Sequence, residues 1–440
     1  MFYNGVQTDT SIVVIVRSTS NGTAVLTLSN GSTDEAAVNT ATNYGHARLE
    51  ITGLSPNTRY TYTVTVPDGT GGSGEITTFK SSGAECIAFF SCEHDTGSGL
   101  IASIAGTAAK AAICLGDEAY TEAATFSSAA DAAELAVHHP WRVSMREKWD
   151  KMYLAQKMGF GVVTDDHDAF VNNVFDDTAD PPATLNARMT HGYTFASAAE
   201  WTAALAAIGE SIYDFSLCNP ISSTVSSDTD PLYFSFEVGN MLVIVPSLVM
   251  WTKTEMRGID NGSTPLMNAN QYTWFKAQIT NTTKKFKVVL SQKTTVVATN
   301  NNTDSWDDFS DMATVLGWID TDSANWAVPG GVIWGTGDWH SPGVGAFNNV
   351  DDAYDHVIIN ACPSGRIGDL RDPGAWLSTT RDAIIMPNDE NDSRFLNYGL
   401  VTSTADYVEI EIMTAMGRWA SGRVAAGENK LSRPDVVVAI

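Results

Sequence analysis

The chain has 440 residues, of which 43% are hydrophobic, 10% aromatic and 18% charged. This composition supplies a large buried core, so it excludes a disordered chain, a collagen-like repeat and a small disulfide-stapled scaffold. Because 51 acidic residues stand against 26 basic ones, the formal net charge is −25, which disfavours binding to a nucleic-acid backbone or to anionic membranes.

The acidic excess has two interpretations. It is either a surface property that favours solubility, for example in a saline environment, or the sign of carboxylates that gather around metal ions. The five cysteines include no C-x-x-C pair, so neither a disulfide framework nor a cysteine-based zinc ribbon fits. No signal peptide is visible, and the longest apolar run, residues 241–251, is interrupted by Pro246 and is too short to span a membrane. We expect a soluble protein that is extracellular or virion-associated, with a cytoplasmic location left open.

Residues 1–82 predict an all-β sandwich. Short runs rich in β-branched and aromatic residues alternate with Asn-Gly pairs and a glycine-rich turn, and they show no helical period. The runs begin at Ser11, Thr23, Ala47, Tyr60 and Glu75. The phrase GLSPNTRYTYTV, which starts at Gly53, resembles the turn and following strand of fibronectin type III domains. This likeness concerns the fold and carries almost no information about function.

Residues 83–440 predict an α/β domain. A strand, a helix of small residues and a second strand follow one another within residues 86–117, which is the pattern of a βαβ unit. Later strand patterns cover residues 160–166, 241–248, 286–292 and 331–338, helical patterns cover 141–158, 197–209, 272–281 and 306–318, and residues 401–414 alternate like a strand.

Four of these predicted strands end in side chains that can bind metal ions. The ends carry Ser91-Cys92, then Gly116-Asp117 with Tyr120, then Asp165-Asp166-His167-Asp168 with Asn172-Asn173, and finally Gly337-Asp338 with His340. If these strands lie side by side, their ends meet at one crevice. Carboxylate and amide oxygens suit calcium, magnesium or manganese, whereas thiolate, phenolate and imidazole suit iron or zinc. A site with both types can hold two unlike cations that share a carboxylate.

Each motif alone also has a simpler interpretation. Asp117 after a glycine is typical of a turn or a helix N-cap, and a lone Cys92 is typical of an inert buried thiol. The pair Asp338 and His340 fits a surface strand end equally well. Residues 165–168 resist such an explanation, because three acids around a histidine repel one another when exposed and need partners when buried. The four ends together favour a metal site.

The order and spacing of these motifs resemble the alkaline phosphatase D (PhoD-like) family of calcineurin-like metallophosphoesterases. The likeness continues through residues 271–275, 287–292 and 397–401, so it covers nearly the whole chain. It implies a four-layer sandwich of two mixed sheets flanked by helices, with a dinuclear metal centre at the strand ends. It also implies a phosphoric ester hydrolase, either an alkaline phosphatase or a phosphodiesterase, in which a metal-activated hydroxide attacks phosphorus.

The resemblance assigns metal-ligating roles to eight residues, namely Cys92, Asp117, Tyr120, Asp165, Asp166, Asn173, Asp338 and His340. In that scheme Cys92 and Tyr120 bind ferric iron, Asp117 bridges both metals, and calcium binds to an aspartate and an asparagine of the third strand end. The sequence leaves open which aspartate of the pair is the ligand and whether Asn172 replaces its neighbour. Zinc, manganese and magnesium are alternative cations.

Two further residues are expected to act on the substrate. His167 is expected to stabilise the transition state or to protonate the leaving oxygen, and Asp168 to orient that imidazole. The chain departs from the family at residues 245–248, which read Val-Pro-Ser-Leu where the family usually has Leu-Asp-Thr-Arg. If that arginine contacts phosphate, a substitute has to come from Arg142, Arg146 or Arg188.

The leading functional hypothesis is the metal-dependent hydrolysis of a small phosphate ester. The alternative is a structural or attachment protein of a virion or surface assembly, which retains a metallophosphoesterase scaffold and meets assembly partners through its N-terminal sandwich. A nuclease is disfavoured, because a charge of −25 with few basic clusters repels long polyanions.

Overall fold

The computed structural model describes the strands of four sheets and two of the helices. The described residues are 2–41, 45–92, 100–117, 157–165, 168, 216–220, 231–249, 252, 265–281, 283–293, 306, 314–315, 317–318, 332–338, 342–348, 355–361, 381–385, 396–414, 417–425 and 431–436. Only the backbone is described for residues 100, 346–348, 355–358, 360, 381–385 and 431–436. None of the helices within these ranges combines the length and the apolar character that crossing a membrane requires.

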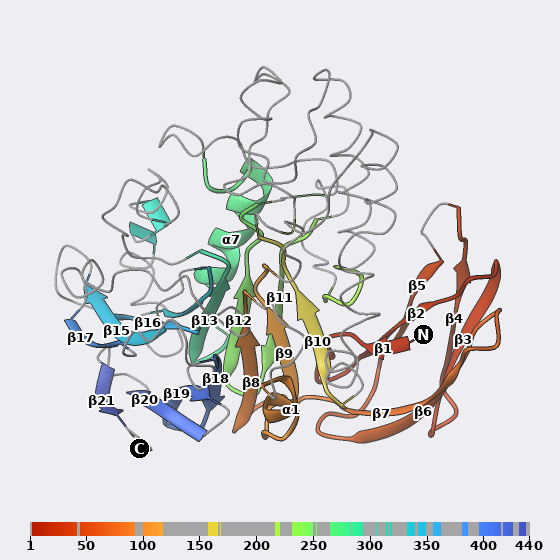
Figure 1. Cartoon of the computed structure of the whole chain (residues 1–440), viewed down its shortest axis with the longest axis horizontal. Coiled ribbons are helices and arrows are strands. Elements are labelled where there is room, and N and C mark those ends of the chain that lie inside the picture. The colour runs from red at the N-terminus through yellow and green to blue at the C-terminus, as the bar shows by residue number, and fades with distance from the viewer. Residues whose placement is uncertain are drawn as a thin grey trace.

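The N-terminal region is a sandwich of two antiparallel sheets, drawn in red and orange in Figure 1. One sheet has the order β1 (Phe2–Asn4), β2 (Ile12–Arg17), β5 (His46–Ile51), and the other has the order β4 (Thr33–Val38), β3 (Gly22–Leu28), β6 (Arg59–Thr65), β7 (Gly72–Thr77). Alternate residues of β6 are buried, as a sheet with one solvated face requires. Leu54 packs in the core between the sheets, and the Tyr60 hydroxyl accepts a hydrogen bond from the Ser55 N–H at 3.1 Å. The predicted all-β sandwich is confirmed.

Two seven-stranded mixed sheets form the rest of the described chain. The first has the order β10 (Gly159–Val162), β9 (Ala111–Cys114), β8 (Glu85–Phe90), β18 (Asn397–Ser403), β19 (Tyr407–Thr414), β20 (Gly417–Ala425), β21 (Leu431–Val436). The second has the order β11 (Phe234–Val238), β12 (Met241–Val245), β13 (Phe286–Ser291), β14 (Ile333–Thr336), β16 (Asp355–Asn360), β15 (Gly343–Asn348), β17 (Arg381–Ile385). Strands β8, β9 and β10 run parallel to one another, as do β12, β13, β14 and β16.

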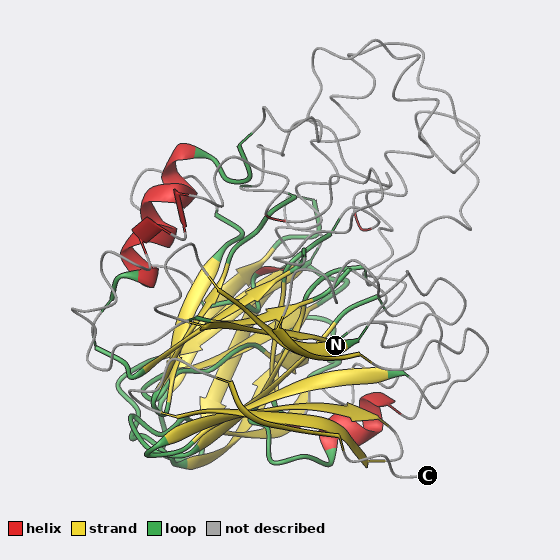
Figure 2. Ribbon diagram, turned by 90° about the vertical axis from the view of Figure 1, so that its left-hand side faces the viewer, coloured by secondary structure: helices red, strands yellow, loops and turns green. Residues whose placement is uncertain are grey.

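The two sheets pack face to face between two helices. Phe89 of the first sheet and Leu290 of the second lie in one shared core. The outer face of the first sheet is covered by α1 (Leu100–Ala105) and that of the second by α7 (Ala269–Ile279), which lie on opposite sides of the sheets (Figure 2). Strands buried on both faces explain the continuous apolar runs in the sequence. The predicted four-layer arrangement is confirmed.

Helix α7 shows how the sequence sets an outer layer. Asn268 is its N-cap, and the Asn268 side chain accepts a hydrogen bond from the backbone N–H of Gln271. Gln271, Trp274, Phe275 and Ile279 are its buried residues, a spacing that places them on one helical face. The helical pattern predicted at residues 272–281 thus corresponds to α7, whereas those at 141–158, 197–209 and 306–318 lie wholly or mostly outside the described residues.

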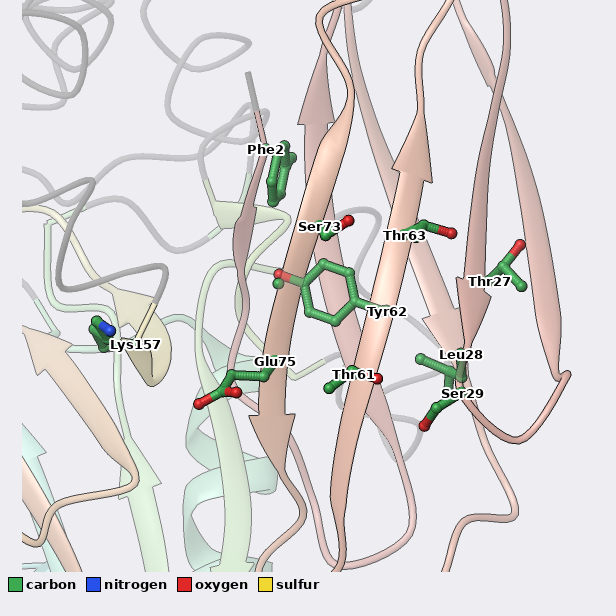
Figure 3. Close-up of a pocket in the computed structure, with 11 residues that line it drawn as sticks. Phe2, Thr27, Leu28, Ser29, Thr61, Tyr62, Thr63, Ser73, Glu75 and Lys157 are labelled. Carbon is green, nitrogen blue, oxygen red and sulfur yellow. The ribbon is translucent and has the colours of Figure 1, made fainter.

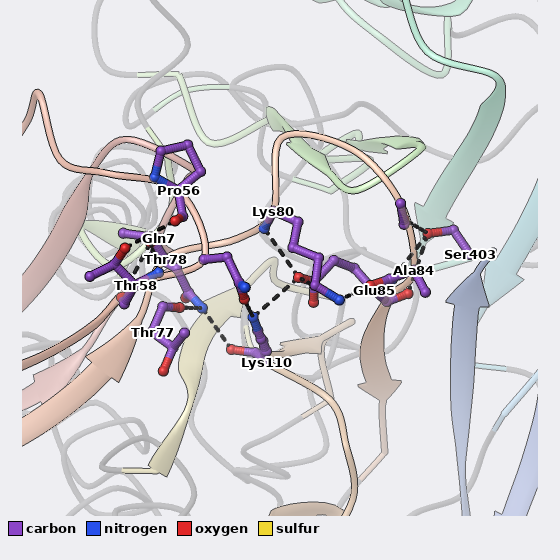
Figure 4. A network of polar contacts seen from close by, with 12 residues as sticks. Gln7, Pro56, Thr58, Thr77, Thr78, Lys80, Ala84, Glu85, Lys110 and Ser403 are labelled. Carbon is purple, nitrogen blue, oxygen red and sulfur yellow. Dashed lines mark hydrogen bonds and ion pairs between the residues drawn. The ribbon is translucent and has the colours of Figure 1, made fainter. Parts of the chain in front are cut away.

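The N-terminal sandwich contacts the first sheet at β10, where Gly5 forms an isolated bridge with Phe160, and near the start of β9. The Gln7 side-chain amide donates to the backbone carbonyl of Lys110 at 2.9 Å, and the Lys110 ammonium binds Asn57 at 3.1 Å and Glu85 at 3.1 Å (Figure 4). The Arg48 guanidinium also donates to the backbone carbonyl of Asn219 at 2.7 Å. Because Lys110 directly precedes β9, these contacts lie at the amino end of that strand. The boundary predicted between residues 82 and 83 falls in the connection between β7 and β8.

Candidate metal centre

Three buried aspartates from both sheets meet at the carboxyl ends of their strands. Asp117 follows β9 and Asp165 follows β10, both in the first sheet, and Asp338 follows β14 in the second. They are 1%, 0% and 8% exposed, and one carboxylate oxygen of each lies within 4.8 Å of the others. Cys92, which follows β8, is also buried, and its thiol donates to Oδ2 of Asp117 at 3.5 Å. The structure therefore brings together four residues that the sequence predicted as metal ligands.

The backbone of these residues has an unusual conformation. Cys92, Asp117 and Asp338 have φ angles of 57°, 55° and 57°, in the left-handed region that residues with a Cβ rarely adopt. Among the described non-glycine residues, only Asn57, with φ of 49°, shares it. Such a conformation costs about 1–3 kcal/mol per residue and is found most often at functional sites. Three of the strand ends thus turn sharply at the residue that carries the candidate ligand.

A glycine before two of the aspartates allows the strand ends to approach each other. A Cβ on Gly116 would lie 2.5 Å from the backbone nitrogen of Asp165, and a Cβ on Gly337 would lie 2.6 Å from Oγ of Ser91. Both distances are shorter than real Cβ contacts. The two Gly-Asp pairs therefore have a steric cause, because a larger residue would press on the Asp165 backbone at one strand end and on the Ser91 side chain at the other.

Asp168 fixes two of the strand ends relative to each other. Its Oδ2 accepts hydrogen bonds from the backbone N–H of Asp117 at 2.8 Å and from that of Asp165 at 2.9 Å. Its own N–H donates to the carbonyl of Asp165 at 3.2 Å, and its side chain is completely buried. Asp168 is therefore a positioning residue for the cluster. Its predicted contact with His167 stays a prediction, because that histidine lies outside the described residues.

A lysine that the sequence reasoning missed lies in the same cluster. The Lys293 ammonium is 3.1 Å from Oδ1 of Asp165 and 3.1 Å from Oδ2 of Asp338, and the side chain is 1% exposed. The available signal was its position, since it directly follows the apolar strand pattern at residues 286–292. A lysine in that place is usually solvated, and only the packing of the two sheets shows that it is buried.

The backbone around Lys293 is held by buried neighbours. The Ser291 hydroxyl donates to the carbonyl of Lys293 at 2.8 Å and accepts a hydrogen bond from Nε1 of Trp306 at 2.9 Å. Gln292 reaches the strand end that carries Asp165, since its side-chain amide donates to the carbonyl of Thr164 at 3.0 Å. These contacts join the end of β13 in the second sheet to the end of β10 in the first.

The remaining predicted site residues lie outside the described part of the chain. They are Tyr120, Asp166, His167, Asn172, Asn173 and His340, together with the proposed phosphate anchors Arg142, Arg146 and Arg188. Their predicted roles stay predictions.

The described donor set fits a metal ion. Three carboxylates lie close together among the described side chains. Those of Asp165 and Asp338 contact the Lys293 ammonium, and that of Asp117 contacts the Cys92 thiol. Buried carboxylates close together repel one another unless cations compensate them, which is the environment that metal sites provide. Carboxylate oxygens bind hard cations and a thiolate binds iron or zinc, so both kinds of ligand are present.

A hollow on the N-terminal sandwich is separate from this cluster. It has a volume of about 840 Å³ and is lined by Phe2, Tyr62, Glu75, Lys157 and neighbouring residues (Figure 3). Burial raises the pKa of the Tyr62 phenol, and its hydroxyl donates to Oδ1 of Asn4 at 2.6 Å. The phenol is therefore held protonated inside the sandwich and is not available as an acid or base.

Two mixed sheets between helices, with candidate ligands at the strand ends, are the arrangement that the sequence predicted. Among solved structures, the chain is similar to PhoD, with a TM-score of 0.74 and 15% identity over 100% of this chain and 92% of that one. It is also similar to a purple acid phosphatase from yellow lupin (Lupinus luteus) seeds, with a TM-score of 0.56 and 9% identity over 98% of this chain and 73% of that one. No family model and no curated protein sequence matches the chain. The predicted resemblance to the alkaline phosphatase D family is confirmed for the fold.

Proposed function

We propose that this protein hydrolyses small phosphate esters at a metal centre built on Asp117, Asp165 and Asp338. The observation that carries the proposal is the convergence of three buried aspartates at the strand ends of a PhoD-like fold. Bound cations neutralise phosphoryl charge and lower the pKa of a coordinated water, so that hydroxide is present near neutral pH. A protein with a net charge of −25 needs such a local positive field to accept an anionic substrate.

The proposed centre holds two unlike cations, ferric iron and calcium. The contact between Cys92 and Asp117 supports an iron subsite on the thiolate side, with Tyr120 and His340 as further proposed ligands. Asp165 and Asp338 belong to the same carboxylate group as Asp117 and would supply hard oxygens for calcium. Asp117 is the proposed bridging ligand, because it contacts the thiol and also belongs to the carboxylate group.

The remaining ligand assignments come from the family resemblance. Asn173, or its neighbour Asn172, is the proposed further calcium ligand, and Asp166 is the alternative to Asp165.

Other residues of the chain position the reacting groups. Asp168 holds the backbones of Asp117 and Asp165, so that their carboxylates keep a fixed separation. His167, between Asp165 and Asp168 in the sequence, is the proposed acid that protonates the leaving oxygen. Lys293 adds a buried positive charge beside two of the aspartates, in a chain that lacks the usual arginine at residues 245–248.

Hydrolysis of chromogenic esters tests the proposal. Protein loaded with iron and calcium should release nitrophenolate from a nitrophenyl phosphate or from its diester, and Asp117→Asn should abolish the release. Asp406→Asn, which changes an exposed aspartate in the turn between β18 and β19, is the matched control and should retain activity. Two bound metals by elemental analysis without turnover of any mono- or diester would contradict the hydrolase proposal.

A structural or attachment role is the second candidate function. With it we propose an extracellular or virion-associated location. This candidate is favoured by the absence of an arginine from residues 245–248, where the family usually carries one. Here the Gln271 side chain accepts from the N–H of Ser247 at 2.7 Å and donates to its carbonyl at 2.9 Å, so helix α7 holds this segment in place without an arginine. Metal binding without hydrolysis would favour this candidate, with the sandwich as the proposed attachment surface.

A further inference from the structure

Lys293 is a cationic side chain inside an otherwise acidic cluster. Its ammonium lies 3.1 Å from one oxygen of Asp165 and 3.1 Å from one oxygen of Asp338, and it is 1% exposed. Among the described residues, these two carboxylates are its ion-pair partners. The ammonium therefore has the position of a cation that the two aspartates share.

A metal ion and this ammonium compete for the same carboxylates. Two cations held by one pair of buried carboxylates repel each other strongly, because little water screens them. A metal ion shared by Asp165 and Asp338 therefore has to displace the ammonium. The displacement breaks two charge-assisted hydrogen bonds, which lowers the net affinity for that metal ion.

The thiolate side of the cluster lacks this obstacle in its described contacts. Cys92 contacts Oδ2 of Asp117, whereas the described ion pairs of Lys293 go to the other two aspartates. A cation held by Cys92 and Asp117 alone would not have to break the two described ion pairs of Lys293.

The geometry around Lys293 allows its side chain to move while its backbone stays fixed. The Lys293 carbonyl is held by Ser291, which is held in turn by Trp306. A lysine side chain has a flexible four-carbon stem, so its ammonium can shift relative to this fixed backbone. No rearrangement of β13 is required.

We propose that Lys293 is a built-in competitor for the cation of the Asp165–Asp338 subsite, so that the two metal subsites fill unequally. The subsite at Cys92 and Asp117 fills first, and the second subsite fills only when a cation displaces the ammonium. This inference rests on the metal centre of the proposed function, but it does not depend on hydrolysis. It makes the fully loaded state dependent on the metal concentration.

Titration of metal-free protein with Mn²⁺, followed by calorimetry and by the electron paramagnetic resonance of free Mn²⁺, tests the inference. Wild-type protein should show two binding steps of unequal affinity. In Lys293→Met the weaker step should tighten by about tenfold or more, because no charge-assisted hydrogen bonds have to be broken. The stronger step should change by less than the weaker one, because the described ion pairs of Lys293 go to Asp165 and Asp338.

The matched control is a second buried lysine on the same strand. Lys287 is 1% exposed, and its ammonium donates to the carbonyl of Lys284 at 3.1 Å, near the opposite end of β13. Lys287→Met removes the same charge and should leave both Mn²⁺ affinities unchanged. If Lys293→Met does not fold, Lys293→Gln replaces it and has the same expected result.

Two results would overturn the inference. They are two steps of equal affinity in wild-type protein, and a weaker step that does not tighten when Lys293 is replaced. A tightened weaker step without ester hydrolysis supports the inference and refutes the proposed function. Hydrolysis with unchanged affinities refutes the inference alone, and protein that binds no Mn²⁺ refutes both.

Discussion

Replacing Asp168 by alanine should loosen the candidate metal centre and destabilise the protein. Asp168 is completely buried, and one of its oxygens accepts hydrogen bonds from two backbone N–H groups, those of Asp117 and Asp165. A hydrogen bond to a charged group contributes about 1.5–3 kcal/mol, so the loss of two should lower the free energy of unfolding by about 3–6 kcal/mol. Asp168→Asn keeps an accepting oxygen but loses the charge, and should cost roughly half as much.

Urea unfolding of the metal-free protein, followed by circular dichroism, measures these differences. Asp406→Ala, at an exposed turn, is the control and should change the free energy of unfolding by less than about 0.5 kcal/mol. Mn²⁺ should bind more weakly to Asp168→Ala than to Asp168→Asn, because the backbones of Asp117 and Asp165 lose their common anchor. If Asp168→Ala is no more destabilising than the control, Asp168 does not position the cluster.

Two further predictions concern packing and pH. Gly337→Ala should destabilise the protein by about 1–3 kcal/mol and weaken metal binding, because the new Cβ would lie 2.6 Å from Oγ of Ser91. Gly317→Ala is the control in thermal unfolding, because a Cβ at that position meets nothing within 4 Å. Equal melting temperatures for the two variants would contradict the steric argument. Burial lowers the pKa of Lys287 to about 8 from its ordinary value of 10.5. Between these values the unfolded chain binds more protons than the folded one, so the free energy of unfolding should rise with pH from about 8 to about 10.5, by up to about 3 kcal/mol. Lys287→Met should remove that rise in unfolding experiments across this pH range, and a rise that persists in the variant would point to another group.

The sequence predicted the parallel strands other than β16 (Asp355–Asn360), because their burial leaves a simple pattern. Strands such as β8, β9 and β13 are buried on both faces, so they read as short apolar runs that end in polar residues. Strand β4 was missed because its sequence TDEAAV is largely polar and only its last residue is fully buried. The alternating pattern at residues 401–414 includes the end of β18, a turn and β19, and the turn depends on hydrogen bonds of the Thr404 hydroxyl that no periodicity shows.

Only part of the candidate site was predictable, because the rest depends on contacts between distant segments. The polar strand ends identified Asp117 and Asp165, which lie side by side in one sheet, and Asp338, which follows a parallel strand of the other sheet. Lys293 was missed because a single lysine after a strand has no distinguishing pattern. The role of Asp168 as an anchor for two backbones also depends on geometry, since its partner Asp117 is 51 positions away in the chain.

The ion pair between Lys293 and Asp165 also has a consequence for assembly of the native state. Asp165 belongs to the end of one sheet and Lys293 to the end of the other, so their contact exists only after the two sheets have docked. The candidate ligands from both sheets therefore reach their spacing only when the two sheets have docked. A cation bound by all three aspartates would therefore bind only to the folded protein. Once bound, it would hold the two sheets together and oppose their separation.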